Sequence, residues 1–294
     1  METRNPITGE KKEREELKAT LWREAKENLE AGRFLEAASI LDRLVQTFPE
    51  DDSALMALAW AYYDGGELDQ AIGSLEELFA RELKRPIFTG FAYDELVRLY
   101  RETKQYDRLI EICLKAYEAY PEEKELGREL GIAYLRGGKT KEAIALFGQL
   151  IKQEPTDASI YCLLGEALIK EGKFTQADRV FTIAANSEPE AAATFYRRLA
   201  TLYLEIGENH RAEEALRKSL TVDERNPLSY ILLGDSLIPQ GKLREAHEAY
   251  KKAISLSPSS ASAIYHRWGM TLLSSLYLAE AEKVLALADT SILP

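Results

Sequence analysis

The segment of this sequence that comes nearest to a catalytic motif is Gly-Gly-Lys-Thr at residues 137–140, because Gly-Lys-Thr closes a phosphate-binding loop. That loop also needs a glycine five residues before its Gly-Lys pair and a strand in front of it. Here Ala133 stands in the glycine position, and residues 130–136 have a helical pattern. The segment is therefore predicted to be the turn of a helical hairpin and not a nucleotide site.

Other reactive side chains do not form a recognisable catalytic or metal-binding set. Cys113 and Cys162 are too few for a disulfide framework or a four-thiolate zinc site. Acidic residues are abundant, but neighbours along a helix do not face one another, so no acid–base pair is indicated. The three histidines occupy unrelated positions: His210, His247 and His266. We therefore expect no enzyme activity, no cofactor and no metal.

Composition narrows the class of protein further. Hydrophobic residues make up 46% of the 294 residues and charged residues 30%, which is typical of a globular, helix-rich chain. No stretch reaches the roughly 18 consecutive apolar residues of a membrane span, and the charged N-terminal residues lack the apolar core of a secretory signal. The net charge of −11 repels phosphate groups. These features predict a cytoplasmic protein with no membrane span and no nucleic-acid partner.

The elements that position these residues repeat along the chain. One frame of 34 to 38 residues fits the sequence from Lys18 nearly to its end, after a charged N-terminal extension at 1–17. It divides residues 18–294 into eight copies: 18–51, 52–89, 90–123, 124–157, 158–192, 193–226, 227–261 and 262–294. A period of this length indicates a repeat architecture and not an ordinary globular domain.

Small residues recur at two places of each copy. At the eighth place stand Ala25, Ala59, Val97, Gly131, Gly165, Ala200, Gly234 and Gly269. At the twentieth place stand Ala37, Ala71, Leu109, Ala143, Ala177, Ala212, Ala246 and Ala281. Because two helices can cross closely only where side chains are small, we expect these two places to face each other in an antiparallel pair.

Glycines and prolines punctuate the same frame. Between the two helices of a pair comes a glycine able to adopt positive φ: Gly32, Gly66, Gly138, Gly172, Gly207 and Gly241. After the second helix comes a proline that cannot extend it: Pro49, Pro121, Pro155, Pro189 and Pro258. Larger residues fill the remaining signature places and are predicted to be core: Tyr62, Tyr100, Tyr134, Tyr203, Phe147, Phe181 and Tyr250.

The period and these signature residues resemble the tetratricopeptide repeat, over about nine tenths of the chain. The resemblance implies an all-α fold, a right-handed superhelical solenoid of antiparallel helix pairs. The third copy departs most, with Lys104 and Leu109 in the glycine and alanine places. It follows a four-residue insertion, Pro86–Thr89, after a helix without its terminal proline. We expect irregular packing there.

By resemblance to the family, the first helix of each pair lines a concave groove that binds a partner. The groove positions predict an aromatic and thioether patch in the first two copies, a basic stripe in the middle copies and an apolar patch in the seventh. The candidate groove residues are Trp22, Lys26, Met56, Trp60, Tyr63, Arg98, Arg101, Arg128, Arg136, Arg197, Leu228 and Ile231. This pattern favours a peptide with acidic residues or an amphipathic helix as ligand.

The sequence therefore predicts an adaptor or scaffold that binds a peptide or helix of another protein. Two alternatives stay open, a self-assembling structural scaffold and a regulatory subunit of an enzyme. The last copy carries Val284, Leu285, Leu287 and Ala288, followed only by residues 289–294, too few for a covering helix. We expect this C-terminal end to mediate a homo-oligomer or to contact a segment outside this sequence. The alternative is that the last residues, which include Ile292 and Leu293, fold back over this face.

Overall fold

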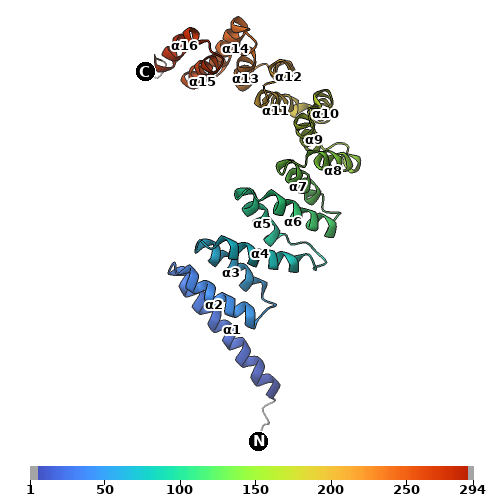
Figure 1. The fold of residues 1–294 in the computed structure, drawn as a ribbon, viewed down its shortest axis with the longest axis vertical. Coiled ribbons are helices and arrows are strands. Elements are labelled where there is room, and N and C mark those ends of the chain that lie inside the picture. The colour runs from blue at the N-terminus through green and yellow to red at the C-terminus, as the bar shows by residue number, and fades with distance from the viewer. Residues whose placement is uncertain (1–5, 291–294) are drawn as a thin grey trace. The chain divides into compact units, whose positions relative to one another are not determined.

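The structure, a computed structural model, describes the backbone of residues 6–290 and the side chains of residues 12–288. Within this part of the chain the regular structure is sixteen α-helices and two short 3-10 helices, with no strand. Consecutive helices pack against each other along each of two compact units, residues 1–137 and 138–294 (Figure 1). The predicted all-α class and the pairing of consecutive helices are confirmed.

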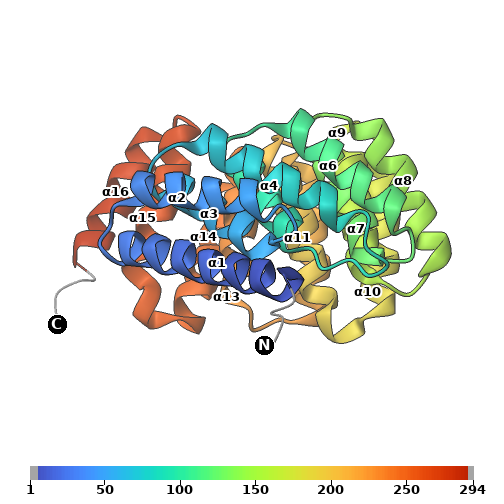
Figure 2. The ribbon, with the colours of Figure 1, turned by 90° about the horizontal axis from the view of Figure 1, so that it is seen from below.

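The described residues of the first unit, 6–137, form seven helices. They are α1 (Pro6–Glu30), α2 (Phe34–Thr47), α3 (Asp52–Asp64), α4 (Leu68–Glu82), α5 (Phe91–Glu102), α6 (Tyr106–Ala119) and α7 (Lys124–Arg136). The described part of the predicted N-terminal extension, residues 6–17, is helical and continuous with α1. Helices α1, α2 and α3 pack in succession (Figure 2). They bury a small core of Leu21, Leu44, Phe48 and Ala54.

Nine α-helices lie in the part of the second unit that the structure describes, residues 138–290. They are α8 (Thr140–Gln153), α9 (Ala158–Lys170), α10 (Phe174–Ser187), α11 (Ala192–Glu205), α12 (Asn209–Val222), α13 (Pro227–Leu237), α14 (Leu243–Leu256), α15 (Ala261–Ser274) and α16 (Leu278–Thr290). Three-residue 3-10 turns at Pro189–Ala191 and Pro258–Ser260 precede α11 and α15. One continuous apolar core runs through this unit from Ala158 to Val284.

The turns have the conformations that the repeat pattern predicts. All six predicted turn glycines adopt positive φ, between 71° and 84°. Lys104 and Leu276, which replace glycine in the same place, also adopt positive φ, 57° and 65°. Side chains bear this conformation less well than glycine does, so the turn geometry prevails over local preference at these two positions. The division into eight copies stays a prediction from the sequence.

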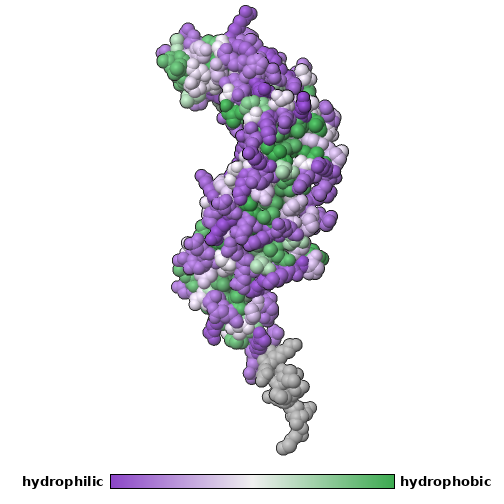
Figure 3. Space-filling model, turned by 45° about the vertical axis from the view of Figure 1, so that its right-hand side comes forward, coloured by the Kyte–Doolittle hydropathy of each residue, from purple (hydrophilic) through white to green (hydrophobic). Residues whose placement is uncertain are grey.

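The core residues are mostly those predicted. Tyr100, Tyr203, Tyr250, Phe147 and Phe181 are fully buried, whereas two of the predicted aromatic residues, Tyr62 and Tyr134, are only half-buried. On the face of the molecule shown in Figure 3, hydrophilic residues predominate and hydrophobic residues occupy smaller areas among them. Such a surface is expected for a chain with 30% charged residues.

The close helix crossing differs in detail from the prediction. The atoms nearest to a Cβ placed on Gly165 belong to the ring of Phe181, at 2.4 and 2.6 Å, and not to Ala177. The ring of Tyr250 lies in the same way over Gly234, at 2.4 Å. The small residue at the eighth place therefore makes room for the side chain sixteen residues later. That side chain lies one helical turn beyond the alanine at the twentieth place.

The last helix pair buries more of its own apolar surface than the sequence predicts. Val284 and Ala288 are buried, and Leu285 packs against Gly269 within the pair. The expectation of an uncovered face is therefore wrong for Val284, Leu285 and Ala288, which α16 packs toward α15, whereas Leu287 is 46% exposed as expected. Ile292 and Leu293 lie outside the described residues. A homo-oligomer through this end stays a prediction.

Candidate functional site

The start of α3 is fixed by a group of polar contacts around Asp51. Its carboxylate accepts a hydrogen bond from Ala54 N (3.0 Å) as the N-cap of α3, and another from Trp22 Nε1 (3.3 Å) on α1. Lys18 Nζ lies 2.9 Å from Asp51 Oδ2. Burial raises the pKa of Asp51, but the bonds from Lys18, Ala54 and Trp22 outweigh burial and hold the pKa below its ordinary value. Trp22 is thus half-buried and engaged within the fold.

An aromatic and basic cluster follows on α3 and α5. The rings of Trp60 and Tyr63 meet edge to face, with centroids 5.7 Å apart. The guanidinium carbon of Arg98, from α5, lies 5.8 Å from the Trp60 centroid and 5.2 Å from that of Tyr63. Cation–π contact of this kind orients the rings and leaves Trp60 38% exposed. Three predicted groove residues are therefore brought together.

A cavity of about 530 Å³ opens beside this cluster, bounded by α3, the end of α4 and the start of α5. We call it the α3–α5 pocket. Its lining is mostly apolar and includes two predicted groove residues, Met56 and Trp60. The complete lining is Asp52, Ser53, Met56, Ala57, Trp60, Leu78, Glu82, Arg85 and Phe91. Phe91 is 67% exposed, so an aromatic ring stands open to solvent at the entrance.

The segment that contains the insertion shapes this pocket. Phe88, in the inserted segment, packs against Tyr120 with ring centroids 4.9 Å apart. The Tyr120 hydroxyl donates to the carbonyl oxygens of Glu82 (2.9 Å) and Arg85 (2.7 Å). Arg85 in turn forms an ion pair with Asp52 at the start of α3. The predicted irregularity is thus an ordered loop that closes one wall of the pocket.

The predicted basic stripe of the first unit is largely neutralised by glutamates. On α5, Arg98 forms ion pairs with Glu95 (2.9 Å) and Glu102 (3.2 Å). Arg101 of α5 pairs with Glu129 of α7. On α7, Arg128 lies 3.5 Å from Glu125. Arg136 is exposed at the end of α7, and Lys26 on α1 lies 3.7 Å from Glu30. Because most of these cations already have anionic partners, the expected attraction for an acidic peptide is reduced.

The candidate residues of the second unit are not gathered into one site. Arg197 on α11 donates to Thr194 Oγ1 at 3.2 Å. On α13, Leu228 is exposed and Ile231 is half-buried against the unit's core. These residues belong to the first helices of two different pairs.

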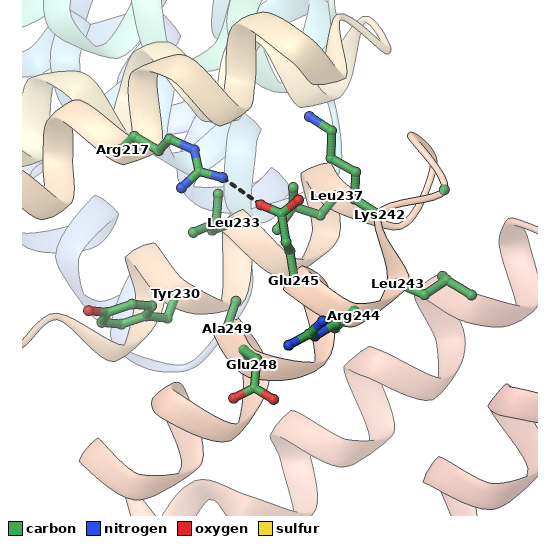
Figure 4. A pocket seen from close by; sticks show the side chains of 11 residues that line it. Arg217, Tyr230, Leu233, Leu237, Lys242, Leu243, Arg244, Glu245, Glu248 and Ala249 are labelled. Carbon is green, nitrogen blue, oxygen red and sulfur yellow. Dashed lines mark hydrogen bonds and ion pairs between the residues drawn. The ribbon is translucent and has the colours of Figure 1, made fainter.

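A larger cavity of the second unit, about 680 Å³, lies among α12, α13 and α14 (Figure 4). Figure 4 shows Tyr230, Leu233 and Ala249 near one another, with Glu248 beside Ala249 and Arg217 directed toward Glu245. There Arg217 Nη2 lies 2.8 Å from Glu245 Oε2. The sequence prediction did not include this cavity, because its lining comes largely from a second helix and a turn.

The two cysteine side chains are packed inside the fold. Burial raises the pKa of both cysteine thiols to about 11, and Cys113 contacts the Tyr93 hydroxyl at 3.4 Å. In the part of the chain that the structure describes, no three metal-ligating residues cluster. Over the same residues, every helix is too short or too polar to cross a membrane. Gly138 forms the α7–α8 turn with φ of 76°.

Sequence reasoning missed the residues that complete the α3–α5 pocket, namely Glu82, Arg85 and Phe91. Glu82 and Arg85 stand at the end of a second helix and in the following loop, outside the first-helix positions used for prediction. The insertion Pro86–Thr89 could have pointed to these residues, because extra residues between two helices change the path of the chain at the ends of both helices.

Comparison with known proteins gives three matching family models. Those described as tetratricopeptide repeat match residues 28–87, 162–227 and 197–261, and one described as TPR repeat matches 131–172. A tetratricopeptide repeat protein of Parabacteroides merdae ATCC 43184 has a similar solved structure, with a TM-score of 0.50 and 18% sequence identity. The match covers 87% of this chain and 99% of that one, and it supports the fold.

The curated relatives include human proteins. Protein O-mannosyl-transferase TMTC1 (Homo sapiens) is 24% identical over 194 residues, which are 62% of this chain and 21% of the relative. Mitochondrial import receptor subunit TOM70 (Homo sapiens) is 27% identical over 114 residues, 38% of this chain and 19% of the relative. The chain thus spans about a fifth of the length of these relatives. From the helix pairs, the turn glycines and the matched models together, the chain belongs to the tetratricopeptide repeat family.

Proposed function

We propose that this chain is a protein-interaction adaptor, and that the α3–α5 pocket anchors a peptide or helix of its partner. The carrying observation is an apolar cavity of about 530 Å³ beside Trp60 and Phe91, two exposed aromatic side chains. Exposed aromatics beside a preformed apolar cavity are typical of the residues that dominate binding energy at protein interfaces.

Two further facts support this proposal. Tetratricopeptide repeat proteins generally act as interaction scaffolds, and the relative TOM70 is named as an import receptor subunit. The transferase activity in the name of TMTC1 is not carried over, because the match covers only 21% of that protein. The proposal includes a cytoplasmic location, which cell fractionation tests.

The test begins with peptides selected from a random displayed library on the immobilised wild-type chain. Each selected peptide is synthesised, and its affinity is measured by fluorescence polarisation. We expect Trp60→Ala to weaken binding by about 30-fold or more, since truncating a hot-spot tryptophan costs about 2 kcal/mol or more. Circular dichroism should show unchanged helicity, because Trp60 is a surface residue.

The matched control is Ile183→Ala on α10, which truncates an apolar side chain of similar exposure, 42%, in the other unit. This variant should bind the peptides as the wild type does. Peptides that bind the Trp60→Ala chain with wild-type affinity would exclude the pocket as the anchor. Light scattering over a range of concentrations separately distinguishes an adaptor from the alternative, a self-assembling scaffold.

A further inference from the structure

A second apolar pocket lies in the second unit, between α14 and α16, with α15 as its floor. We call it the α14–α16 pocket. Its volume is about 280 Å³, and its described lining includes none of the predicted groove residues. Trp268 on the floor is 5% exposed, and its ring stacks on those of Tyr250 and Tyr265, with centroids 5.0 and 6.2 Å apart. The floor is therefore rigid, which lowers the cost of ordering the site on binding.

The α14–α16 pocket repeats the position of the larger cavity shown in Figure 4. In both, a first helix supplies the floor, and the second helices before and after it supply the walls. The two sites can therefore be compared residue by residue. Residues at the same places of the frame form the floors, Tyr230, Leu233 and Leu237 in the larger cavity and Tyr265, Trp268 and Leu272 in the α14–α16 pocket.

The walls of the two sites differ in their charge pairing. In the larger cavity Arg217 of α12 pairs with Glu245 of α14 at 2.8 Å, and this ion pair joins the two walls (Figure 4). Lys251 of α14 and Glu280 of α16 stand in the same places of the α14–α16 pocket. Over the described residues these two form no ion pair, so the walls of the α14–α16 pocket are not joined in this way.

The rim of the α14–α16 pocket is also more basic. Lys283 of α16 stands where the larger cavity has Glu248. Lys283 and Lys251 are exposed on opposite walls, and neither has an ion-pair partner among the residues that the structure describes. Because the net charge of the chain is −11, most of its surface repels a segment that carries carboxylates, whereas these two lysines attract one.

The size and the lining of the pocket decide what can enter it. A volume of about 280 Å³ lies below the roughly 300–1,000 Å³ of clefts that enclose drug-sized small molecules, and it favours a single side chain as occupant. Leu243, Val284 and Leu287 line the walls above Trp268. Leu287 is 46% exposed, so part of this apolar wall faces solvent. A large apolar side chain would cover it.

We propose that the α14–α16 pocket is a docking site for a partner segment that inserts one large apolar side chain over Trp268. Aspartate or glutamate residues beside that side chain would lie against Lys251 and Lys283. This inference goes beyond the proposed function, which concerns a pocket of the other unit. The occupant is a segment of another protein, and the experiment separates it from a second copy of this chain and from the chain's own residues 291–294.

The experiment starts from peptides selected out of a random displayed library on the immobilised Trp60→Ala chain, in which the α3–α5 pocket is impaired. Affinities are measured by fluorescence polarisation, with every further change made in this same background. We expect peptides with a large apolar residue next to aspartate or glutamate, and Leu287→Ala should weaken their binding by about 5-fold or more. The matched control is Ile183→Ala on α10, at the same place of the frame and 42% exposed, which should leave binding unchanged.

A charge exchange tests the lysines. Lys251→Glu should weaken binding of the acidic peptides by about 5-fold, and raising the salt concentration should reduce this loss. The control is Lys252→Glu, at the next residue of α14, which is also exposed but does not line the pocket. It should change affinity by less than about 2-fold. The Lys251→Glu chain should in turn bind a peptide whose acidic residue is replaced by lysine more tightly than it binds the parent peptide.

Four results would overturn the inference. One is the recovery of no peptide whose binding depends on Leu287, and another is a set of Leu287-dependent peptides without acidic residues. A third is an oligomer in light scattering that Leu287→Glu disperses, because a second copy would then be the occupant. The fourth is peptide binding that appears only after residues 291–294 are removed, because the chain's own end would then fill the pocket. The proposed function is judged separately, by the effect of Trp60→Ala on peptides selected with the wild type.

Discussion

The ring of Phe181 on α10 occupies the space that a side chain at Gly165 on α9 would need. Adding one methyl group there, by Gly165→Ala, should therefore change the stability of the fold. A Cβ atom at Gly165 would lie 2.4 Å from Phe181 Cε2. Carbon atoms in contact are about 3.5 Å apart, so the ring must move by about 1 Å to admit the methyl group. Phe181 is fully buried, so its ring can move only against other packed side chains.

The magnitude follows from two opposing terms. Overpacking a close-packed core typically costs about 1–3 kcal/mol, whereas replacing glycine by alanine inside a helix gains about 1 kcal/mol. We therefore expect Gly165→Ala to be destabilising by about 1 kcal/mol. The control is Gly148→Ala on α8, where no atom lies within 4 Å of the new Cβ. That variant should be stabilised by about 1 kcal/mol, so the two substitutions shift stability in opposite directions.

A second variant tests the pairing itself. In the next copy of the repeat, Ala200 occupies the place of Gly165, and Leu216 occupies the place of Phe181. An alanine at the first place is thus paired with a leucine, not an aromatic ring, at the second. Gly165→Ala combined with Phe181→Leu should therefore cost less than the two single changes added together, by about 1 kcal/mol or more. Urea unfolding followed by circular dichroism measures all four chains. Additive effects, or a Gly165→Ala chain as stable as Gly148→Ala, would show that ring and methyl group do not share this space.

Three further outcomes follow from particular residues. Burial raises the pKa of Glu213, but hydrogen bonds from Lys242 and its other donors hold that pKa below the ordinary 4.5, so this stabilisation is present above that pH and lost as pH falls through the lowered pKa. In urea unfolding, Glu213→Gln should cost about 1 kcal/mol or more at pH 7, and this difference should shrink in acid; an undiminished difference in acid would contradict the assignment. Burial raises the pKa of Cys113 and Cys162 to about 11, so both thiols should stay unmodified by a thiol reagent at pH 8 until urea unfolds the chain, and fast native labelling would contradict this packing. Leu276 has a φ of 65° and is 81% exposed, so Leu276→Gly should raise stability by about 1 kcal/mol, and a lower melting temperature would refute strain at this turn.

The helix pairs and their turns could be predicted because steric rules act locally. A glycine with positive φ and a proline after a helix have nearly the same effect in any copy of the frame. The contact between Gly165 and Phe181 was placed on Ala177 instead, since spacing alone shows that a place must be small but not which side chain fills the space. Recurring small residues therefore show where two helices cross closely. Which side chain fills the space beside the small residue is seen only in the structure.

The charge of the groove was harder to predict. Glu95 and Glu102 stand three residues before and four after Arg98, a spacing that puts all three on one helix face. That pairing was available from the sequence. The pairing of Arg101 with Glu129 was not, because the two residues belong to different helices, and their distance depends on how α5 and α7 pack.

The candidate pocket lies where the repeat is broken, and the break explains its chemistry. In α8 and α10 the helix ends before Glu154 and Glu188, whose φ values are near −130°, and the chain leaves in an extended turn. In α4 the corresponding residue, Glu82, is still helical, and Leu83 continues with helical angles into the inserted loop. Without a proline to end the helix, the carboxylate stays inside the fold, where Thr89 and Ala92 bind only one of its oxygens. The insertion thus leaves a buried carboxyl group at the place where α8 and α10 have already ended, with one oxygen hydrogen-bonded and the other without a partner.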